Sequence, residues 1–223
     1  MRAALALVML AASLAHAAPK PPCAKCTLDI PKADGPRPLL VVLHGDRDHA
    51  KDQAAKWRAA TRAAGYVLLA LECPASEGCK GSWWQWAGDP AWVIAQVDAV
   101  AAQTSIDPER IYLAGWSGGA SYLGMNAASW PDRFAAVVIH GGGMSPQAQC
   151  PGHVVPTYFL VGDANPLHRL AVDLRSWIEG CGGETTWDLV KRGDHAAEER
   201  ALTARKAAAI LDWCGGLSRR STR

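Results

Sequence analysis

The chain has 223 residues, of which 49% are hydrophobic, and a formal net charge of +2 at pH 7. A chain of this length and composition can bury a substantial core, so we expect one globular domain. The near-neutral charge, without a clustered basic face, gives no reason to expect nucleic acid or an acidic partner.

The first residues have the layout of a secretory signal. Arg2 precedes an apolar run over residues 3–14, and Ala15-His16-Ala17 follows with small residues at the cleavage position. We therefore expect residues 1–17 to be removed from a secreted or periplasmic protein. The run is shorter than the roughly 20 apolar residues that a membrane span needs, so we expect no stable membrane insertion.

Seven cysteines follow the expected cleavage point, and an exported protein meets oxidising conditions. Disulfides are therefore expected, with at least one cysteine left unpaired. Cys73 and Cys79 lie in one loop and are the favoured pair. Cys23 and Cys26 form a C-x-x-C sequence that a redox or zinc site could use, but its proline-rich surroundings favour a structural role.

Residues 18–38 are rich in proline and predict an irregular lead-in with at most one short strand, before a single domain over 39–223. From residue 39 onward, apolar strand-like runs alternate with helical patterns. The expected strands are at 39–44, 66–72, 110–115, 134–142 and 157–163, with a last strand and loop over 185–195. The expected helices are at 49–64, from 90 onward, from 118 to about 130, at 166–180 and at 197–214. This alternation predicts a parallel sheet with helices on both faces.

The sequence GWSGG at 115–119 joins an expected strand directly to an expected helix. A strand that turns sharply into a helix lifts the turn residue above the sheet edge, and its neighbours two positions away must be very small. Gly115 and Gly119 meet that requirement around Ser117. The pattern predicts a nucleophile elbow with Ser117 as the catalytic nucleophile.

A serine nucleophile needs a base and a carboxylate that orients the base. Asp163 follows an expected strand end, and His195 follows the next, so both should lie at the edge where Ser117 lies. We expect Asp163 to be the acid and His195 the base. Three other residues are weaker alternatives because they neighbour the base in sequence, lie within a strand, or begin a helix: Asp194, Asp188 and His168.

An oxyanion hole is the third requirement for acyl transfer. We expect its donors to be the backbone N–H of Gly118 and that of Asp46, in the loop after the first strong strand. The IHGGG sequence at 139–143 follows the nucleophile, so we expect it to line the pocket floor instead. His44, Asp46, Asp48 and His49 would rarely converge on a metal ion, so we expect no metal site.

Tryptophan is unusually abundant, with ten residues against two phenylalanines. Trp83, Trp84 and Trp86 lie in a loop at the expected active-site edge, and Trp116 precedes the nucleophile. Such rings could stack on an aromatic or sugar group of a substrate, or they could simply cover the edge of the core. We treat all four as candidate substrate-binding residues.

These motifs resemble the α/β-hydrolase superfamily, and within it the small secreted esterases grouped with polyhydroxybutyrate depolymerases and feruloyl esterases. The resemblance rests on the residues at 41–45, 106–122, 130–142, 158–165 and 193–196. It implies a mostly parallel sheet of about six to eight strands without a lid domain. It also implies ester hydrolysis through an acyl-enzyme formed on Ser117, without a cofactor.

The expected substrate is a small-molecule or polymer ester whose acyl and alcohol parts the sequence does not define. Two alternatives stay open at this point. A prolyl-peptidase-like serine peptidase would share the Gly-Trp-Ser elbow, and a non-catalytic binding protein would share the scaffold. The sequence leaves the oligomeric state undefined.

Overall fold

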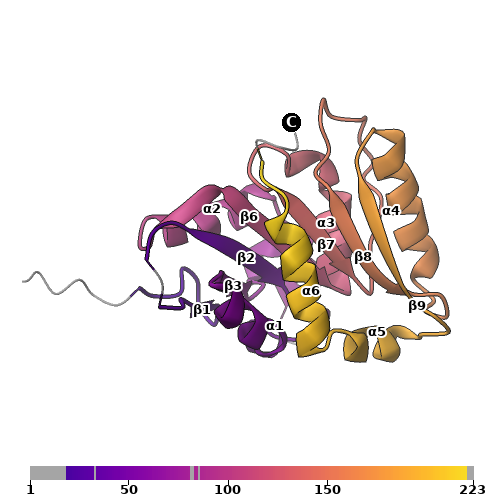
Figure 1. Cartoon of the computed structure of the whole chain (residues 1–223). Helices are drawn as coiled ribbons and strands as arrows, with labels where there is room; N and C mark the ends of the chain where they lie inside the picture. The colour runs from indigo at the N-terminus through magenta and orange to yellow at the C-terminus, as the bar shows by residue number, and fades with distance from the viewer. Residues whose placement is uncertain (1–18, 33, 81–82, 85, 220–223) are drawn as a thin grey trace, which may run out of the picture.

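The computed structural model describes residues 19–32, 34–80, 83–84 and 86–219 (Figure 1). The expected signal peptide at 1–17 lies outside the described residues. Among the described residues, no helix is long and apolar enough to cross a membrane.

Seven strands of the described chain form the main sheet, in the order β1-β3-β2-β6-β7-β8-β9. β1 pairs antiparallel with β3, and every other neighbouring pair is parallel. The predicted mostly parallel sheet of six to eight strands is therefore confirmed. The strands are β1 (Thr27–Asp29), β2 (Arg37–Leu43), β3 (Val67–Leu71), β6 (Ile106–Trp116), β7 (Ala136–His140), β8 (Thr157–Gly162) and β9 (Thr185–Val190).

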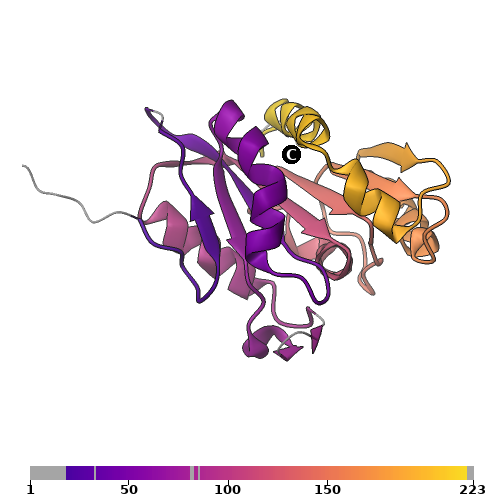
Figure 2. The same cartoon turned by 90° about the horizontal axis from the view of Figure 1, so that it is seen from below.

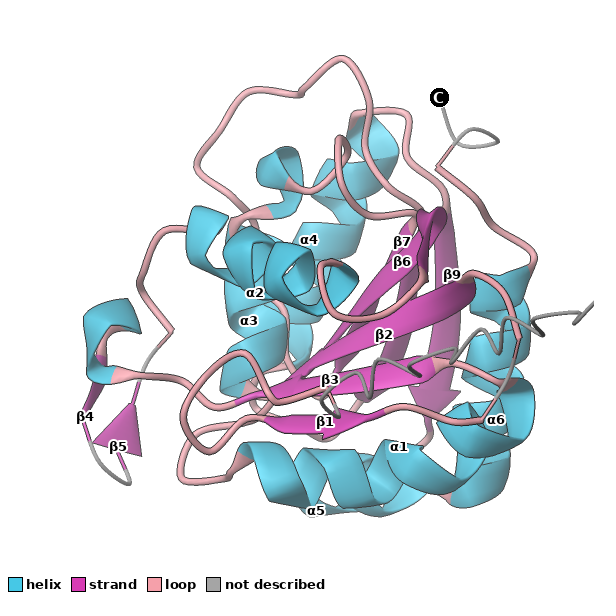
Figure 3. Ribbon diagram, turned by 90° about the vertical axis from the view of Figure 1, so that its left-hand side faces the viewer, coloured by secondary structure: helices cyan, strands magenta, loops and turns pink. Residues whose placement is uncertain are grey.

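Helices cover both faces of this sheet (Figures 1 and 3). α1 (Ala50–Ala64) and α6 (Ala204–Gly215) lie side by side on one face. α2 (Ala91–Ala101), α3 (Gly118–Met125) and α4 (His168–Gly180) pack on the other. α5 (His195–Ala201) contacts β8 and β9. Two short 3₁₀ turns, Ala75–Glu77 and Ala127–Ser129, complete the helical elements.

The core follows the two-residue period of a strand buried on both faces. In β2, Leu39, Val41 and Leu43 face the layer of α2, α3 and α4, whereas Leu40 and Val42 face α1 and α6. All five are at most 1% exposed. This burial explains why the sequence shows an unbroken apolar run here rather than an alternating one.

Two expected element boundaries were wrong. The strand expected at 110–115 starts earlier, because β6 begins at Ile106 and pairs there with Arg37. A register shift between Arg37 and Leu39 makes the start of β6 irregular. Pro108 lies in this irregular part, which is where a sheet tolerates proline. The boundary expected at residue 39 likewise falls within β2, which begins at Arg37.

The expected helix at 197–214 was also wrong, since the chain forms two helices there. α5 begins at His195, two residues earlier than expected, and ends at Ala201. Thr203 then caps α6 by accepting a hydrogen bond from the Lys206 backbone N–H at 3.2 Å. The early start of α5 places His195 on a helix rather than in a loop.

Disulfides join three pairs of cysteines in the described chain. The predicted Cys73–Cys79 pair is confirmed, and Cys23–Cys26 and Cys150–Cys181 are also bonded. Cys214, on α6, is the unpaired cysteine and is fully buried. The Cys73–Cys79 loop carries a separate two-stranded hairpin, β4 (Cys79–Lys80) and β5 (Trp83–Trp84), which stands apart from the main sheet (Figures 2 and 3).

Candidate active site

Ser117 occupies the sharp turn between β6 and α3 that the sequence predicts. Its φ of 50° and ψ of −112° place a residue other than glycine in a strained region of backbone space. A Cβ on Gly115 would lie 2.6 Å from the Ala120 backbone nitrogen, and one on Gly119 would lie 2.6 Å from the His44 carbonyl oxygen. The elbow therefore forms only because both positions lack a side chain.

The glycine-rich end of β7 supports the elbow from beneath. The Ser117 backbone N–H donates to the His140 carbonyl oxygen at 2.9 Å. A side chain on Gly142 would overlap the Ser117 carbonyl group, and one on Gly141 would overlap the Trp116 ring. The residues at 139–143 thus pack directly against the elbow, and whether they line a substrate pocket stays a prediction.

His195 lies next to Ser117 although the two residues are 78 positions apart in the sequence. It is the first residue of α5 and follows the turn after β9, where Arg192 has a positive φ of 56°. Its Nε2 lies 2.9 Å from Ser117 Oγ. The structure therefore brings together the two residues that sequence analysis chose as nucleophile and base.

The expected hydrogen bond between Asp163 and His195 is not present in the described structure, where His195 Nδ1 has other neighbours. The Asp163 carboxylate instead accepts a hydrogen bond from the Arg192 backbone N–H, in the turn before α5. His195 Nδ1 lies 3.0 Å from Oε2 of Glu198, a residue that sequence analysis did not consider. The reason is helical geometry: residues three apart on a helix share a face, so Glu198 lies beside His195.

Glu198 is fully buried, and hydrogen-bond donors surround its carboxylate. The Gly162 backbone N–H donates to Oε1 at 2.5 Å, and Asn165 Nδ2 donates to Oε2 at 2.5 Å. Asn165 Oδ1 accepts from the Leu167 backbone N–H at 2.9 Å, which fixes the orientation of the amide. Asn165 Nδ2 also lies 3.1 Å from His195 Nδ1.

Trp116 lies against the imidazole of His195. The two rings are stacked, with centroids 4.5 Å apart and planes within 7° of parallel. The indole is 7% exposed and also lies 4.3 Å from the His140 ring. The structure therefore places this candidate substrate-binding residue in the support of the imidazole.

His140 connects the elbow to α5 through its backbone carbonyl and its side chain. Its backbone carbonyl holds Ser117, and its Nε2–H donates to the Glu198 carbonyl oxygen at 2.7 Å. The side chain is 2% exposed, and burial lowers its pKa to about 4. His140 is therefore a neutral hydrogen-bond donor at neutral pH.

The loop after β2 lies against the elbow, as the oxyanion-hole prediction requires. A Cβ on Gly45 would lie 3.1 Å from Ser117 Cβ, so the backbone passes close to the nucleophile. Gly118 is the first residue of α3, where a backbone N–H has no partner within the helix. The carboxyl of Asp46 packs against Gly118, and the resulting desolvation raises the pKa of Asp46.

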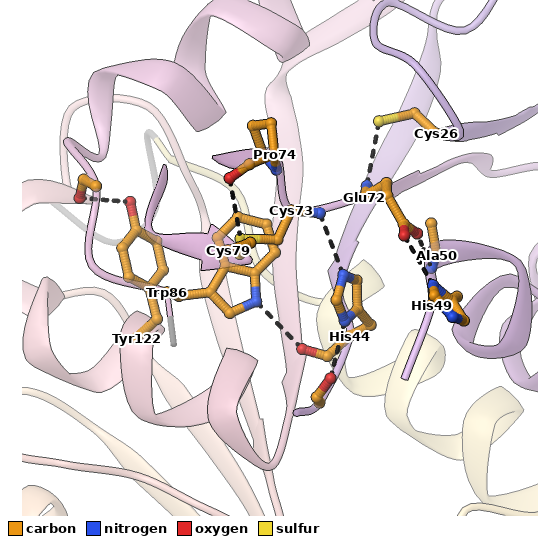
Figure 4. Close-up of a disulfide and its surroundings, with 12 residues drawn as sticks. Cys26, His44, His49, Ala50, Glu72, Cys73, Pro74, Cys79, Trp86 and Tyr122 are labelled. Carbon is orange, nitrogen blue, oxygen red and sulfur yellow. Dashed lines mark hydrogen bonds and ion pairs between the residues drawn. A yellow bond between two sulfur atoms is a disulfide. The ribbon is translucent and has the colours of Figure 1, made fainter. Parts of the chain in front are cut away.

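Hydrogen bonds of His44 hold the start of this loop in place (Figure 4). His44 Nδ1–H donates to the Gly45 carbonyl oxygen at 2.8 Å, and its Nε2 accepts from the Cys73 backbone N–H at 3.1 Å. Trp86 Nε1–H donates to the His44 carbonyl oxygen at 3.3 Å. Burial lowers the pKa of His44, which keeps the ring neutral in this arrangement.

The next residues of the loop use their side chains to begin α1. Glu72 accepts from the Ala50 backbone N–H at 2.8 Å and pairs with His49 Nδ1 at 2.8 Å. Asp48 accepts from Gln53 Nε2 at 2.5 Å. Within the described ranges, no group of three His, Cys, Asp or Glu side chains is arranged to hold a metal ion.

The tryptophans after β3 have different positions from one another. Trp86 is 2% exposed and packs between His44 and Tyr122, with ring centroids 5.7 and 5.5 Å away, so it belongs to the core (Figure 4). Trp83 and Trp84 form β5, and their side chains lie outside the described part of the chain.

The three weaker alternatives for the acid and base have partners elsewhere. Asp194 caps α5 by accepting from the Ala197 backbone N–H at 2.8 Å. Asp188 accepts from Tyr158 and pairs with Lys206. His168 begins α4 and lies edge-on to Trp187 at 5.8 Å.

Comparison with known proteins places the chain in a family. The family model described as "Esterase PHB depolymerase" matches residues 27–179, which include the elbow and end before α5. NocK of Nocardia uniformis subsp. tsuyamanensis, which bears a provisional esterase name, is 33% identical over 59% of this chain and 41% of its own. Poly(3-hydroxyalkanoate) depolymerase C of Paucimonas lemoignei is 35% identical over 48% of this chain and 28% of its own. The chain thus spans less than half the length of these two relatives.

Solved structures of esterases share the fold. A truncated carbohydrate esterase from gut microbiota superposes with a TM-score of 0.68 and 15% identity, covering 86% of this chain and 90% of that one. A thermostable esterase gives a TM-score of 0.65 and 19% identity, covering 86% of this chain and 59% of that one. The architecture is therefore that of the α/β-hydrolase esterases. The chain belongs to the Esterase PHB depolymerase family.

Proposed function

We propose that this protein is a serine hydrolase that cleaves carboxylic esters through an acyl-enzyme on Ser117. The observation that carries the proposal is the 2.9 Å approach of His195 Nε2 to the hydroxyl of a serine held in a strained elbow. A base at hydrogen-bond distance is what a serine hydroxyl needs in order to act as a nucleophile at neutral pH. The family of the chain supports the same chemistry.

The reaction would proceed in two steps of the same kind. Ser117 Oγ attacks the ester carbonyl carbon while its proton passes to His195 Nε2, and the electron pair of the carbonyl bond moves to the oxygen. His195 then gives the proton to the departing alcohol as the ester bond breaks. Water repeats the sequence, with His195 as base, and releases the acid and free Ser117.

The backbone N–H groups of Gly118 and Asp46 are the proposed donors to the negatively charged carbonyl oxygen. Support comes from the position of Gly118 at the start of α3 and from the close approach of the Gly45 backbone to Ser117. Preorganised donors of this kind typically contribute about 10²–10³ in rate each. Both donors are backbone groups, so side-chain changes would remove them only by moving the loop.

We also propose that the mature protein is exported after cleavage following Ala17. The three disulfides in the described chain fit an oxidising compartment. Amino-terminal sequencing of protein recovered outside the cytoplasm should begin at Ala18. Recovery of uncleaved, reduced protein from the cytoplasm alone would contradict export.

The activity is tested with wild-type protein and Ser117→Ala on short p-nitrophenyl esters, hydroxycinnamoyl esters, polyester oligomers and peptide amides. We expect wild-type protein to hydrolyse esters and to be labelled by a fluorophosphonate. The variant should be unlabelled and should lose on the order of 10⁶ in kcat, the loss typical of removing a serine nucleophile. Preferential cleavage of the amides would support a peptidase, and binding without turnover of any substrate would support a binding protein.

A further inference from the structure

The carboxylate behind His195 is not the one that strand order suggests. We propose that Glu198, with the amide of Asn165 beside it, is the acidic group that positions His195 and balances its charge. This inference rests on the proposed ester hydrolysis, because it assigns a partner to the base of that reaction. The observation that carries it is the 3.0 Å separation of Glu198 Oε2 from His195 Nδ1.

The donors around Glu198 are arranged to hold a negative charge. Burial of an ionised carboxylate is costly unless hydrogen bonds satisfy its oxygens. Oε1 accepts from Gly162, while Oε2 accepts from Asn165 and faces His195 Nδ1. With three N–H donors directed at two oxygens, the ionised form is solvated by the protein itself.

This arrangement fixes the tautomer of the imidazole. A carboxylate oxygen can only accept, so the proton of neutral His195 lies on Nδ1 and is donated to Glu198. The lone pair then lies on Nε2, which faces Ser117 Oγ at 2.9 Å. During attack, the serine proton moves to Nε2 while the Nδ1 proton stays on the ring. The positive charge that forms on His195 is adjacent to the negative charge of Glu198.

The Asn165 amide has one fixed orientation beside Glu198 and His195. Its Oδ1 is occupied by the Leu167 backbone N–H, so its Nδ2 faces Glu198 and lies 3.1 Å from His195 Nδ1. An aspartate at this position would therefore have an oxygen within reach of the same ring nitrogen. This proximity provides a way to move the negative charge from one side chain to the other.

The hydrogen bonding of Asp163 argues against a role in orienting His195. Its carboxylate holds the Arg192 backbone N–H and so stabilises the turn that leads into α5. Two other titratable groups interact electrostatically with His195: Asp46, in the loop after β2, and His140, which is neutral. Unlike Asp163 and Asp46, Glu198 has a carboxylate that is hydrogen-bonded to the imidazole in the described structure.

The first experiment compares E198Q, D163N and E199Q with wild-type protein in ester hydrolysis. E198Q should lower kcat on the order of 10⁴-fold with little change in KM, as expected when a triad carboxylate becomes an amide. D163N should lower kcat less than about tenfold because the turn keeps its hydrogen bond acceptor. E199Q is the matched control: Glu199 lies on the same helix, is half-exposed and pairs with Lys56. It should retain wild-type kcat.

The second experiment relocates the charge in the double variant N165D/E198Q. We expect it to recover at least about tenfold in kcat over E198Q, since a carboxylate again reaches His195 Nδ1. If Glu198 had only a structural role, the double variant would not recover kcat over E198Q. Thermal unfolding of each variant separates loss of folded protein from loss of catalysis.

The outcomes distinguish the two proposals. Wild-type activity in E198Q, or a loss on the order of 10⁴-fold in D163N, would overturn the assignment of Glu198 while leaving ester hydrolysis intact. If E198Q fails to fold, D163N still decides between the two carboxylates. Absence of ester turnover in wild-type protein would instead refute the proposed function.

Discussion

The nucleophile elbow and the segment that carries the base reach the same site by different physical means. The elbow is determined by backbone contact: glycines at 115 and 119 let β6 and α3 approach each other, and no side-chain partner is required. The base segment is determined by side chains on α5, where His195 and Glu198 share one helical face. Local glycine spacing predicts the first arrangement, whereas the second depends on where a short helix begins.

The elbow should fail if its glycine spacing is broken. In Gly119→Ala, the new Cβ would lie 2.6 and 2.7 Å from the carbonyl oxygens of His44 and Leu43, which are backbone atoms and cannot rotate away. We expect a loss of several kcal/mol in the free energy of unfolding, or no folded protein. Gly152→Ala is the control, since nothing lies within 4 Å of its Cβ position. Equal stability of the two variants in urea unfolding would contradict the backbone explanation.

His140 links the two regions, and its buried neutral ring should make stability depend on pH. The unfolded chain protonates this histidine near pH 6.5, but the folded protein does so only near the lowered pKa of about 4. Between these values the unfolded state binds more protons, so stability present above pH 6.5 is lost as the pH falls towards 4. The contribution is roughly 3 kcal/mol.

This pH dependence is measured by urea unfolding between pH 7 and pH 4. His140→Gln keeps a side-chain donor without a titrating group, so its stability should fall less over this interval than that of wild-type protein. Buried His44 has a pKa shifted in the same direction and should remain as a smaller slope in the variant. Identical slopes in the two proteins would show that His140 is protonated equally in both states.

The start of α5 offers the smallest and most specific test. Asp194 and Thr203 cap successive helices, and removing either cap should cost about 1 kcal/mol of unfolding free energy. Only Asp194→Ala should also lower kcat, by several-fold, because α5 alone carries His195 and Glu198. Thr203→Ala should be equally destabilised with unchanged kcat. Equal kcat in the two variants would mean that the beginning of α5 does not position the base.

Sequence analysis succeeded where the structure depends on short-range pattern. The apolar run at 39–43 predicts a doubly buried strand, and the glycines around Ser117 predict the elbow. The rule that parallel strands end at one edge correctly brings His195 to Ser117, across 78 residues. Cys73 and Cys79 are close enough in sequence for their disulfide to be predicted.

Sequence analysis did not foresee the contact between Glu198 and His195, because the strand-end rule specifies an edge and not the direction of a side chain. Asp163 does lie at that edge, but its carboxylate faces the turn at Arg192. The segment HAAEER has little apolar periodicity, so its helical start at His195 was not recognised. A usable signal was present: Asp194 can cap a helix, and this would place His195 and Glu198 three residues apart on it. The matched family model also ends at residue 179, before this segment.

The most direct measurement is the protonation state of the two ring nitrogens of neutral His195 by ¹⁵N NMR. His195→Asn identifies the resonances. Because Glu198 accepts from Nδ1, we predict a protonated Nδ1 and an unprotonated Nε2 in wild-type protein and in D163N. A proton on Nε2 with Nδ1 unprotonated would contradict the assignment of Glu198 as the group that orients the base.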